Sequence, residues 1–206
     1  MPLTAYTPPE LLAKFRALRN AVDASEFFSK PEHKKLQELW CAAHFGCGLE
    51  ILARPCTLFV SDRDEQLDAD FELEMEGKRH SFQITEVQTP GRRRGDEYKG
   101  RSTGPWTDED WTLGTKHGAE WIRAAIEKKA HHYAITKDLH LLVYLNFPAR
   151  DQQYEELKSQ TEQVASDFAS VWLLTGNTLC TIKPCPILPT VGGWLSIEES
   201  NTQSEA

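Results

Sequence analysis

The chain has 206 residues, of which 40% are hydrophobic and 26% charged, and its formal net charge at pH 7 is −8. These values are typical of a globular protein with one domain of ordinary size. The sequence has no run of about 20 apolar residues, and no basic and then apolar segment follows Met1. We therefore expect a soluble, cytoplasmic protein that does not associate with membranes.

Two helices are predicted near the N-terminus. Thr7 is a good N-cap and Pro8 suits a first helical turn, after which apolar residues recur at helical spacing. A second helix is predicted to begin at Pro31. Gly46 and Gly48 are expected to end it, because glycine commonly follows the last turn of a helix.

Three short strands are predicted next, over residues 56–60, 71–75 and 81–88. In the second strand apolar residues alternate with glutamates, which indicates a half-exposed strand. The dipeptide Gly77-Lys78 predicts a turn, so the second and third strands are expected to form a hairpin.

The second half of the chain combines a long loop with further helices and strands. Residues 139–147 are almost continuously apolar, which is typical of a buried central strand. The predicted segments are a loop at 89–115, a helix at 116–134, the strand at 139–147, a helix at 151–170, and terminal strands at 171–174 and 179–182.

This order of elements predicts an α/β fold. Three early strands followed by a helical crossover imply a mixed central sheet with helices on both faces, which is a three-layer sandwich with an αβββαβ core. We expect a single domain over residues 1–195. Residues 196–206 are polar and acidic and are predicted to be a disordered tail.

Charge is unevenly distributed along the chain. Residues 62–76 contain eight acidic residues and one base, whereas residues 91–101 contain five bases and two acids. The basic segment makes a nucleic-acid partner possible despite the negative total, and the alternative is a pair of solvated surfaces.

A pair of acids on the predicted hairpin is the main candidate for chemistry. Asp70 begins one strand and Glu86 lies near the end of its partner, so the two carboxylates can meet at one end of the hairpin. Two carboxylates are suitable ligands for Mg²⁺ or Mn²⁺, and water molecules would complete the coordination shell of the ion. A two-residue turn at Gly77-Lys78 would put Asp70 and Glu86 on opposite faces of the hairpin. A bulge or a break in the strand would bring them to the same face. Asp68 is the alternative ligand.

The predicted elements follow the order αβββαβ, with Asp70 on the second strand and Glu86 on the third. In this arrangement residues 31–147 resemble the PD-(D/E)XK, restriction-endonuclease-like superfamily. The third strand ends in Glu86-Val87-Gln88, which matches the acidic part of the motif. Two further stretches, GRRRGDEY at 91–98 and KKAHHY at 128–133, are similar to bacterial proteins assigned to that superfamily as endonucleases.

The resemblance implies a Mg²⁺-dependent nuclease that hydrolyses phosphodiester bonds in DNA. Asp70 and Glu86 would bind the metal, which activates water and offsets charge on the phosphate. Gln88 stands where the superfamily has a lysine, and an amide can position water but supplies no positive charge. Lys129 lies about 20° from the centre of the apolar arc of its helix, so it is the candidate substitute cation.

Basic residues of the long loop are the candidate DNA contacts. They are Arg92, Arg93, Arg94, Lys99 and Arg101. Their charges suit phosphate groups, and Tyr98, Trp106 and Trp111 in the same loop suit stacking on bases. Alternatively, the arginines pair with nearby acids and order the loop without a ligand.

The sequence also fits two functions without catalysis. The same fold with a degenerate site could bind nucleic acid or a protein partner without catalysis, which Gln88 and the acidic total favour. A purely protein-binding factor is a third hypothesis. The chain could also form a homodimer.

Overall fold

The computed structural model of the protein describes residues 3–23, 26, 33–52, 54–61, 69–91, 106–132, 137–149 and 153–197. The helices are α1 (Pro8–Asn20), α3 (Lys34–Ile51), α4 (Asp108–His132) and α5 (Tyr154–Ala165). The strands are β1 (Thr4–Tyr6), β2 (Thr57–Val60), β3 (Phe71–Met75), β4 (Lys78–Gln88), β5 (His140–Asn146), β6 (Ser170–Thr175), β7 (Thr178–Lys183) and β8 (Leu195–Ser196).

One mixed sheet contains these strands in chain order. The strands from β1 to β4 pair antiparallel, β4, β5 and β6 pair parallel, and β6 to β8 pair antiparallel again. The predicted α/β class with a mixed sheet is therefore confirmed. β1 was not predicted from the sequence, and β8 extends the sheet to Ser196, the first residue of the predicted tail.

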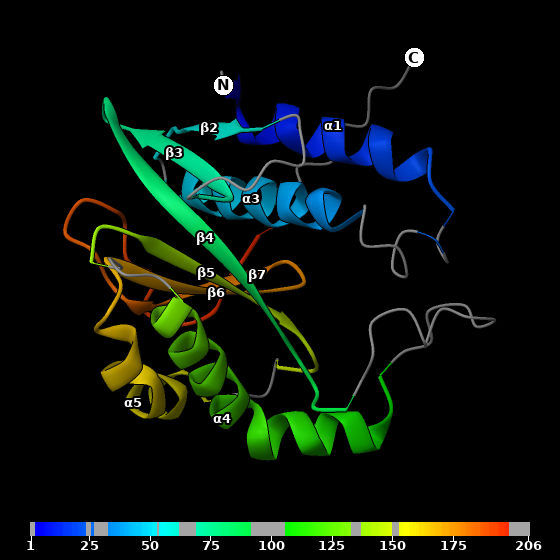
Figure 1. Ribbon diagram of the computed structural model, residues 1–206, viewed down its shortest axis with the longest axis vertical. Coiled ribbons are helices and arrows are strands. Elements are labelled where there is room, and N and C mark those ends of the chain that lie inside the picture. Colours follow the sequence, from blue (N-terminus) through cyan, green and yellow to red (C-terminus); the bar gives the residue numbers. More distant parts are fainter. Residues whose placement is uncertain are drawn as a thin grey trace.

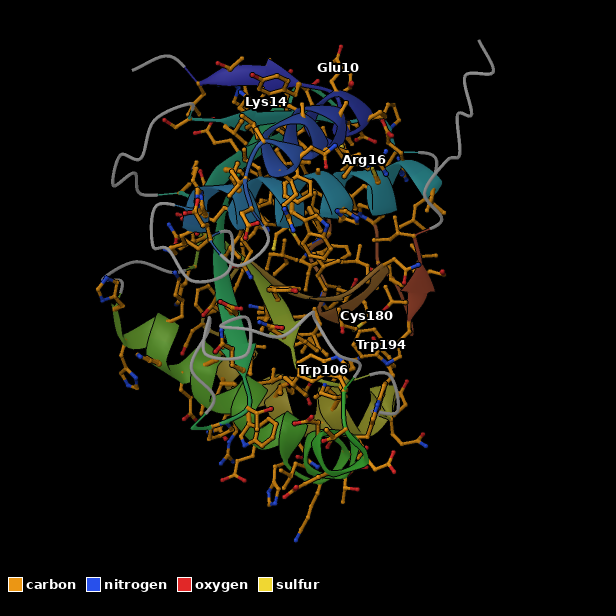
Figure 2. All side chains as sticks on the ribbon, turned by 90° about the vertical axis from the view of Figure 1, so that its right-hand side faces the viewer. Glu10, Lys14, Arg16, Trp106, Cys180 and Trp194 are labelled. Carbon is orange, nitrogen blue, oxygen red and sulfur yellow. The ribbon has the colours of Figure 1, made fainter. Side chains whose placement is uncertain are left out.

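Helices cover both faces of the sheet. Figure 1 shows α1 and α3 on one side of the strands and α4 and α5 on the other, and Figure 2 shows the same order after a 90° turn, with Lys14 of α1 far from α4. Two apolar clusters fill the spaces between these layers. The first includes Phe45 of α3 and Trp172 of β6, and the second includes Ile122 of α4 and Leu157 of α5.

α3 continues past the two glycines that were expected to end it. A Cβ atom at Gly46 would lie 2.7 Å from Pro8 Cγ and 2.9 Å from a methyl group of Leu58. A Cβ atom at Gly48 would lie 2.8 Å from a methyl group of Leu179. The prediction was wrong because these glycines let α3 pack closely against α1 and the sheet.

The β3–β4 hairpin turns one residue earlier than predicted. Met75 pairs with Lys78, so Glu76 and Gly77 form the turn, with φ angles of +52° and +73°. Two consecutive left-handed residues are the requirement of a type I′ turn, and glycine meets it most easily. Phe71 consequently pairs with Phe82, whereas a turn at Gly77-Lys78 would have placed it opposite Ile84.

α4 begins at Asp108, eight residues before the predicted start at Lys116. Thr107 and Asp110 explain the difference, because they form a reciprocal capping interaction. The Thr107 hydroxyl accepts a hydrogen bond from the Asp110 backbone N–H at 3.2 Å, and the Asp110 carboxylate accepts one from the Thr107 backbone N–H at 2.9 Å. Trp111 is therefore helical.

Gly114 lets the first turns of α4 approach the segment after β5. An alanine Cβ at this position would lie 2.3 Å from the Pro148 carbonyl oxygen, which is a backbone atom. We expect Gly114→Ala to lower the free energy of unfolding by about 2 kcal/mol, because this overlap outweighs the gain of ~1 kcal/mol in helix propensity. Urea unfolding measures the change, and Gly192→Ala, which meets no atom within 4 Å, is the control. Equal stability of the two variants would contradict the close approach.

None of the helices in the described part of the chain has the length of apolar sequence that crossing a lipid bilayer requires.

Candidate functional site

β4 extends beyond its hairpin partner, and the candidate residues gather at this extension. β3 pairs with β4 only as far as Phe82, whereas β5 pairs with β4 as far as Gln88. In Figure 1, β4 runs from the hairpin with β3 towards α4. Side chains, instead of a strand, therefore contact the β4 edge next to Ile84.

Asp70 and Lys129 both bind the backbone of Ile84. The Asp70 carboxylate accepts a hydrogen bond from the Ile84 N–H at 2.6 Å, and the Lys129 ammonium donates one to the Ile84 carbonyl oxygen at 3.1 Å. The Asp70 backbone N–H also donates to the Phe82 carbonyl oxygen at 2.8 Å. The strand thus breaks at Asp70, whose carboxylate takes the place of the next β3 residue along the β4 edge.

Burial lowers the pKa of Lys129, and the positive charge of Lys34 lowers it further. The negative charges of Asp70 and Glu38 act in the opposite direction without reversing the shift. Lys129 comes from α4, Asp70 precedes β3, and Lys34 and Glu38 belong to α3. Charged side chains from both helical layers therefore lie near Ile84 of β4.

Glu86 is held by two amide side chains. Its Oε1 atom accepts hydrogen bonds from Gln37 of α3 at 3.1 Å and from Asn146 of β5 at 2.7 Å. These two amides are 49 and 60 residues away in the chain, and nothing in the local sequence around Glu86 indicates them. They stabilise one orientation of the carboxylate, since both donate to the same oxygen.

A pocket of about 440 Å³ lies between β4 and α4. Its strand wall comes from the consecutive residues Thr85 to Gln88 and from Pro90. Its helical wall consists of residues that share one face of α4, namely Trp121, Ala124, Ala125, Lys128, Lys129 and His132. This volume is within the range of small-molecule sites in proteins.

A second, much smaller cavity adjoins Glu86 on the α3 side. Its volume is about 40 Å³, and Lys34, Gln37, Glu38, Ile84, Glu86 and Tyr144 line it. Glu86 therefore contributes to both the pocket and the small cavity.

The predicted nucleic-acid contacts Arg92, Arg93, Arg94, Lys99 and Arg101 lie outside the described residues, as do Asp68 and Tyr98. DNA binding stays a prediction, and so does the homodimer. The acidic strand β3 has its own partner, because Arg79 of β4 pairs with Glu72 at 3.4 Å and with Glu74 at 3.1 Å.

The donor set for a divalent cation is sparse. Asp70 and Glu86 each use one carboxylate oxygen in the hydrogen bonds above, and the Lys129 ammonium lies beside Asp70. Within the described ranges, no group of three or more His, Cys, Asp or Glu side chains is placed to hold a metal ion. These residues therefore fit a metal centre poorly, and Mg²⁺ or Mn²⁺ stays a prediction.

No protein-family model matches the chain, and no curated protein matches it. A similar solved structure is that of a protein of unknown function from Pseudomonas aeruginosa strain PAO1, described as a member of the monooxygenase superfamily. The two chains are 16% identical and superpose with a TM-score of 0.45 over 94% of this chain and 97% of that chain. At this level the similarity assigns neither a family nor an activity to the chain.

These findings correct the predicted relationship to the PD-(D/E)XK superfamily. None of the comparisons supports a nuclease. The predicted DNA endonuclease activity and its alternative, a degenerate nuclease module, are therefore wrong. Two observations agree with the correction: Gln88 supplies no cation at the lysine position, and the donor set for a metal is sparse. The restriction-endonuclease-like core is likewise not confirmed.

Proposed function

We propose that the protein binds a small anionic organic molecule in the pocket between β4 and α4. The observation that carries this proposal is the helical wall, where Lys128, Lys129 and His132 stand beside an apolar surface that includes Trp121. Cationic side chains attract an anionic group, and the apolar wall buries the rest of a ligand. The shared chemistry is that of a carboxylate or a phosphate ester.

The strand wall complements the helical wall. Thr85 and Val87 share the face of β4 that packs towards α4, because Val87 belongs to the same apolar cluster as Ile122 and Ile126, so the Thr85 hydroxyl is a polar group opposite the lysines.

Calorimetric titration tests the proposal. Small carboxylates and phosphate esters are compared with neutral amides and alcohols of the same shape, in low and high salt. We expect binding of the anionic series, weaker binding in high salt, and about tenfold weaker binding by Lys128→Gln, because one charge contact is lost. The matched control is Lys116→Gln, since Lys116 is an exposed residue of α4 outside the pocket.

The outcomes separate the alternatives. Equal affinity for neutral and anionic compounds, or equal effects of the two lysine substitutions, would overturn the anionic site. Titrations in EDTA and in Mg²⁺ give a separate result: binding that requires Mg²⁺ would support the predicted cofactor, and metal-independent binding would support recognition by the lysines alone.

A further inference from the structure

The helical wall of the pocket has an aromatic end and a basic end. Trp121 lines one end, and Lys128 and His132 follow it seven and eleven residues later on α4. At about 100° per residue, both basic residues lie within about 20° of Trp121 around the helix. The rise of about 1.5 Å per residue places Lys128 about 10 Å from Trp121 along the helix axis. One face of α4 therefore presents an indole ring and basic groups at separate positions.

Small side chains separate these two ends. Ala124 and Ala125 lie in the turn between Trp121 and Lys128, and both line the pocket. Ala124 is exposed and Ala125 is half-buried, and a methyl group leaves most of the space above the helix open. The strand wall adds the apolar side chain of Val87. The space between the two ends therefore suits the hydrocarbon part of a ligand.

Two ring contacts hold the Trp121 indole in position. The indole meets the buried Phe147 ring edge-on, with centroids 5.2 Å apart and an angle of 83° between the planes. It also stacks with the His117 ring at 6.1 Å and 23°. A ring that is already fixed loses little conformational freedom when a second ring packs against it. Aromatic rings favour stacked or edge-on partners, so this end of the pocket suits an aromatic ring of a ligand.

We propose that the ligand of this pocket is an arylalkyl anion, with its ring against Trp121 and its carboxylate or phosphate at Lys128 and His132. This inference rests on the proposed function and specifies the ligand class. Because about two helical turns separate the two ends, we expect about four carbon atoms between the ring and the anionic group. In benzoate the ring and the carboxylate are directly bonded, so this ion is too short to contact both ends.

Calorimetric titration of the native chain tests the ligand class. It compares 5-phenylpentanoate with benzoate, with 5-cyclohexylpentanoate and with the neutral 5-phenylpentanamide. We expect 5-phenylpentanoate to bind about tenfold more tightly than benzoate, because only the longer acid contacts both ends. It should bind about threefold more tightly than the cyclohexyl acid, because only an aromatic ring pairs with the indole. Titration of 4-phenylbutyl phosphate shows which anionic group binds more tightly, and tight binding of either group supports the inference.

Substitution of Trp121 tests the aromatic end. Trp121→Leu is expected to bind 5-phenylpentanoate about tenfold more weakly, whereas Trp121→Phe, which retains a ring, should keep most of the affinity. The matched control is Trp111→Leu, since Trp111 is a half-buried residue of α4 outside the pocket. Circular dichroism establishes that the variants are folded, and the ligand series on the native chain depends on no variant.

The outcomes separate this inference from the proposed function. Equal binding of the phenyl and cyclohexyl acids, or of benzoate and 5-phenylpentanoate, would overturn the arylalkyl ligand and leave the anionic site standing. Equal effects of Trp121→Leu and Trp111→Leu would do the same. Equal binding of 5-phenylpentanoate and its amide, or binding of none of the anions, would overturn both.

Discussion

The free energy of unfolding is expected to fall by about 3 kcal/mol as the pH decreases from 6.5 to 4, because of one buried histidine. Burial is the main cause that lowers the pKa of His140 from 6.5 to about 4, and nearby His80 adds repulsion. Between these values the unfolded chain binds a proton that the folded chain excludes, so stability is complete above pH 6.5 and decreases below it.

The contacts of His140 explain why it stays neutral. Its ring stacks on Phe82 with centroids 4.8 Å apart and meets His80 edge-on at 5.2 Å. Its Nδ1 atom lies 2.7 Å from Ser170 Oγ, which also accepts a hydrogen bond from the Trp172 indole N–H at 2.9 Å. The pKa of His80 is lowered as well, by burial and by Lys78, so it adds to the effect in the same direction.

Urea unfolding at a series of pH values measures this loss. His140→Gln cannot take up a proton, so its stability should vary much less between pH 6.5 and 4, whatever its stability at pH 7. The control is His131→Gln, an exposed residue of α4, which should keep the wild-type slope. If the free energy of unfolding of His140→Gln changed with pH as it does in the wild type, another group would be the cause of the pH dependence.

Phe45→Ala is expected to lower the free energy of unfolding by about 4 kcal/mol. The Phe45 ring is fully buried and lies 5.0 Å from Phe82, 5.1 Å from Trp172 and 6.1 Å from Phe71, measured between ring centroids. Removing it leaves a cavity between α3 and the sheet that these aromatic rings cannot close without moving the strands.

Thermal and urea unfolding test this expectation. Phe45→Leu retains most of the apolar volume and should cost about 1–1.5 kcal/mol, and Leu18→Ala, at a position that is 40% exposed, should cost less than about 0.5 kcal/mol. A loss below about 2 kcal/mol for Phe45→Ala would contradict the rigid packing of this aromatic cluster.

Local signals in the sequence predict much of the fold. Thr7 and Glu10 form the capping box at the start of α1, and both residues are within one turn of each other. The nearly continuous apolar run at 139–147 predicts β5, which is buried between two parallel neighbours. Such elements follow from neighbouring residues alone.

Other elements depend on contacts between distant segments. The continuation of α3 through Gly46 depends on the close approach of Pro8 and Leu58, which local propensity does not contain. The early start of α4 differs from this case, since the pattern Thr107-x-x-Asp110 is present in the sequence and is a signal for a helix start.

The candidate site shows the same division. The helical arc of α4 predicts that Lys129 faces inward, and its side chain is half-buried. The register of the hairpin, however, depends on whether the turn starts at Glu76 or Gly77. Gln37 and Asn146 could not be predicted as partners of Glu86, because their approach depends on how α3 and β5 are placed around β4.

The position of Glu86 joins the two sides of the sheet. It contributes to the pocket beside α4 and to the small cavity beside α3, and through Gln37 it is tied to the first turns of α3. We expect a ligand that displaces this part of β4 from the α4 side to move the contact between Glu86 and Gln37 in the opposite layer as well. Binding beside α4 would then change the position of α3, a helix that does not line the pocket.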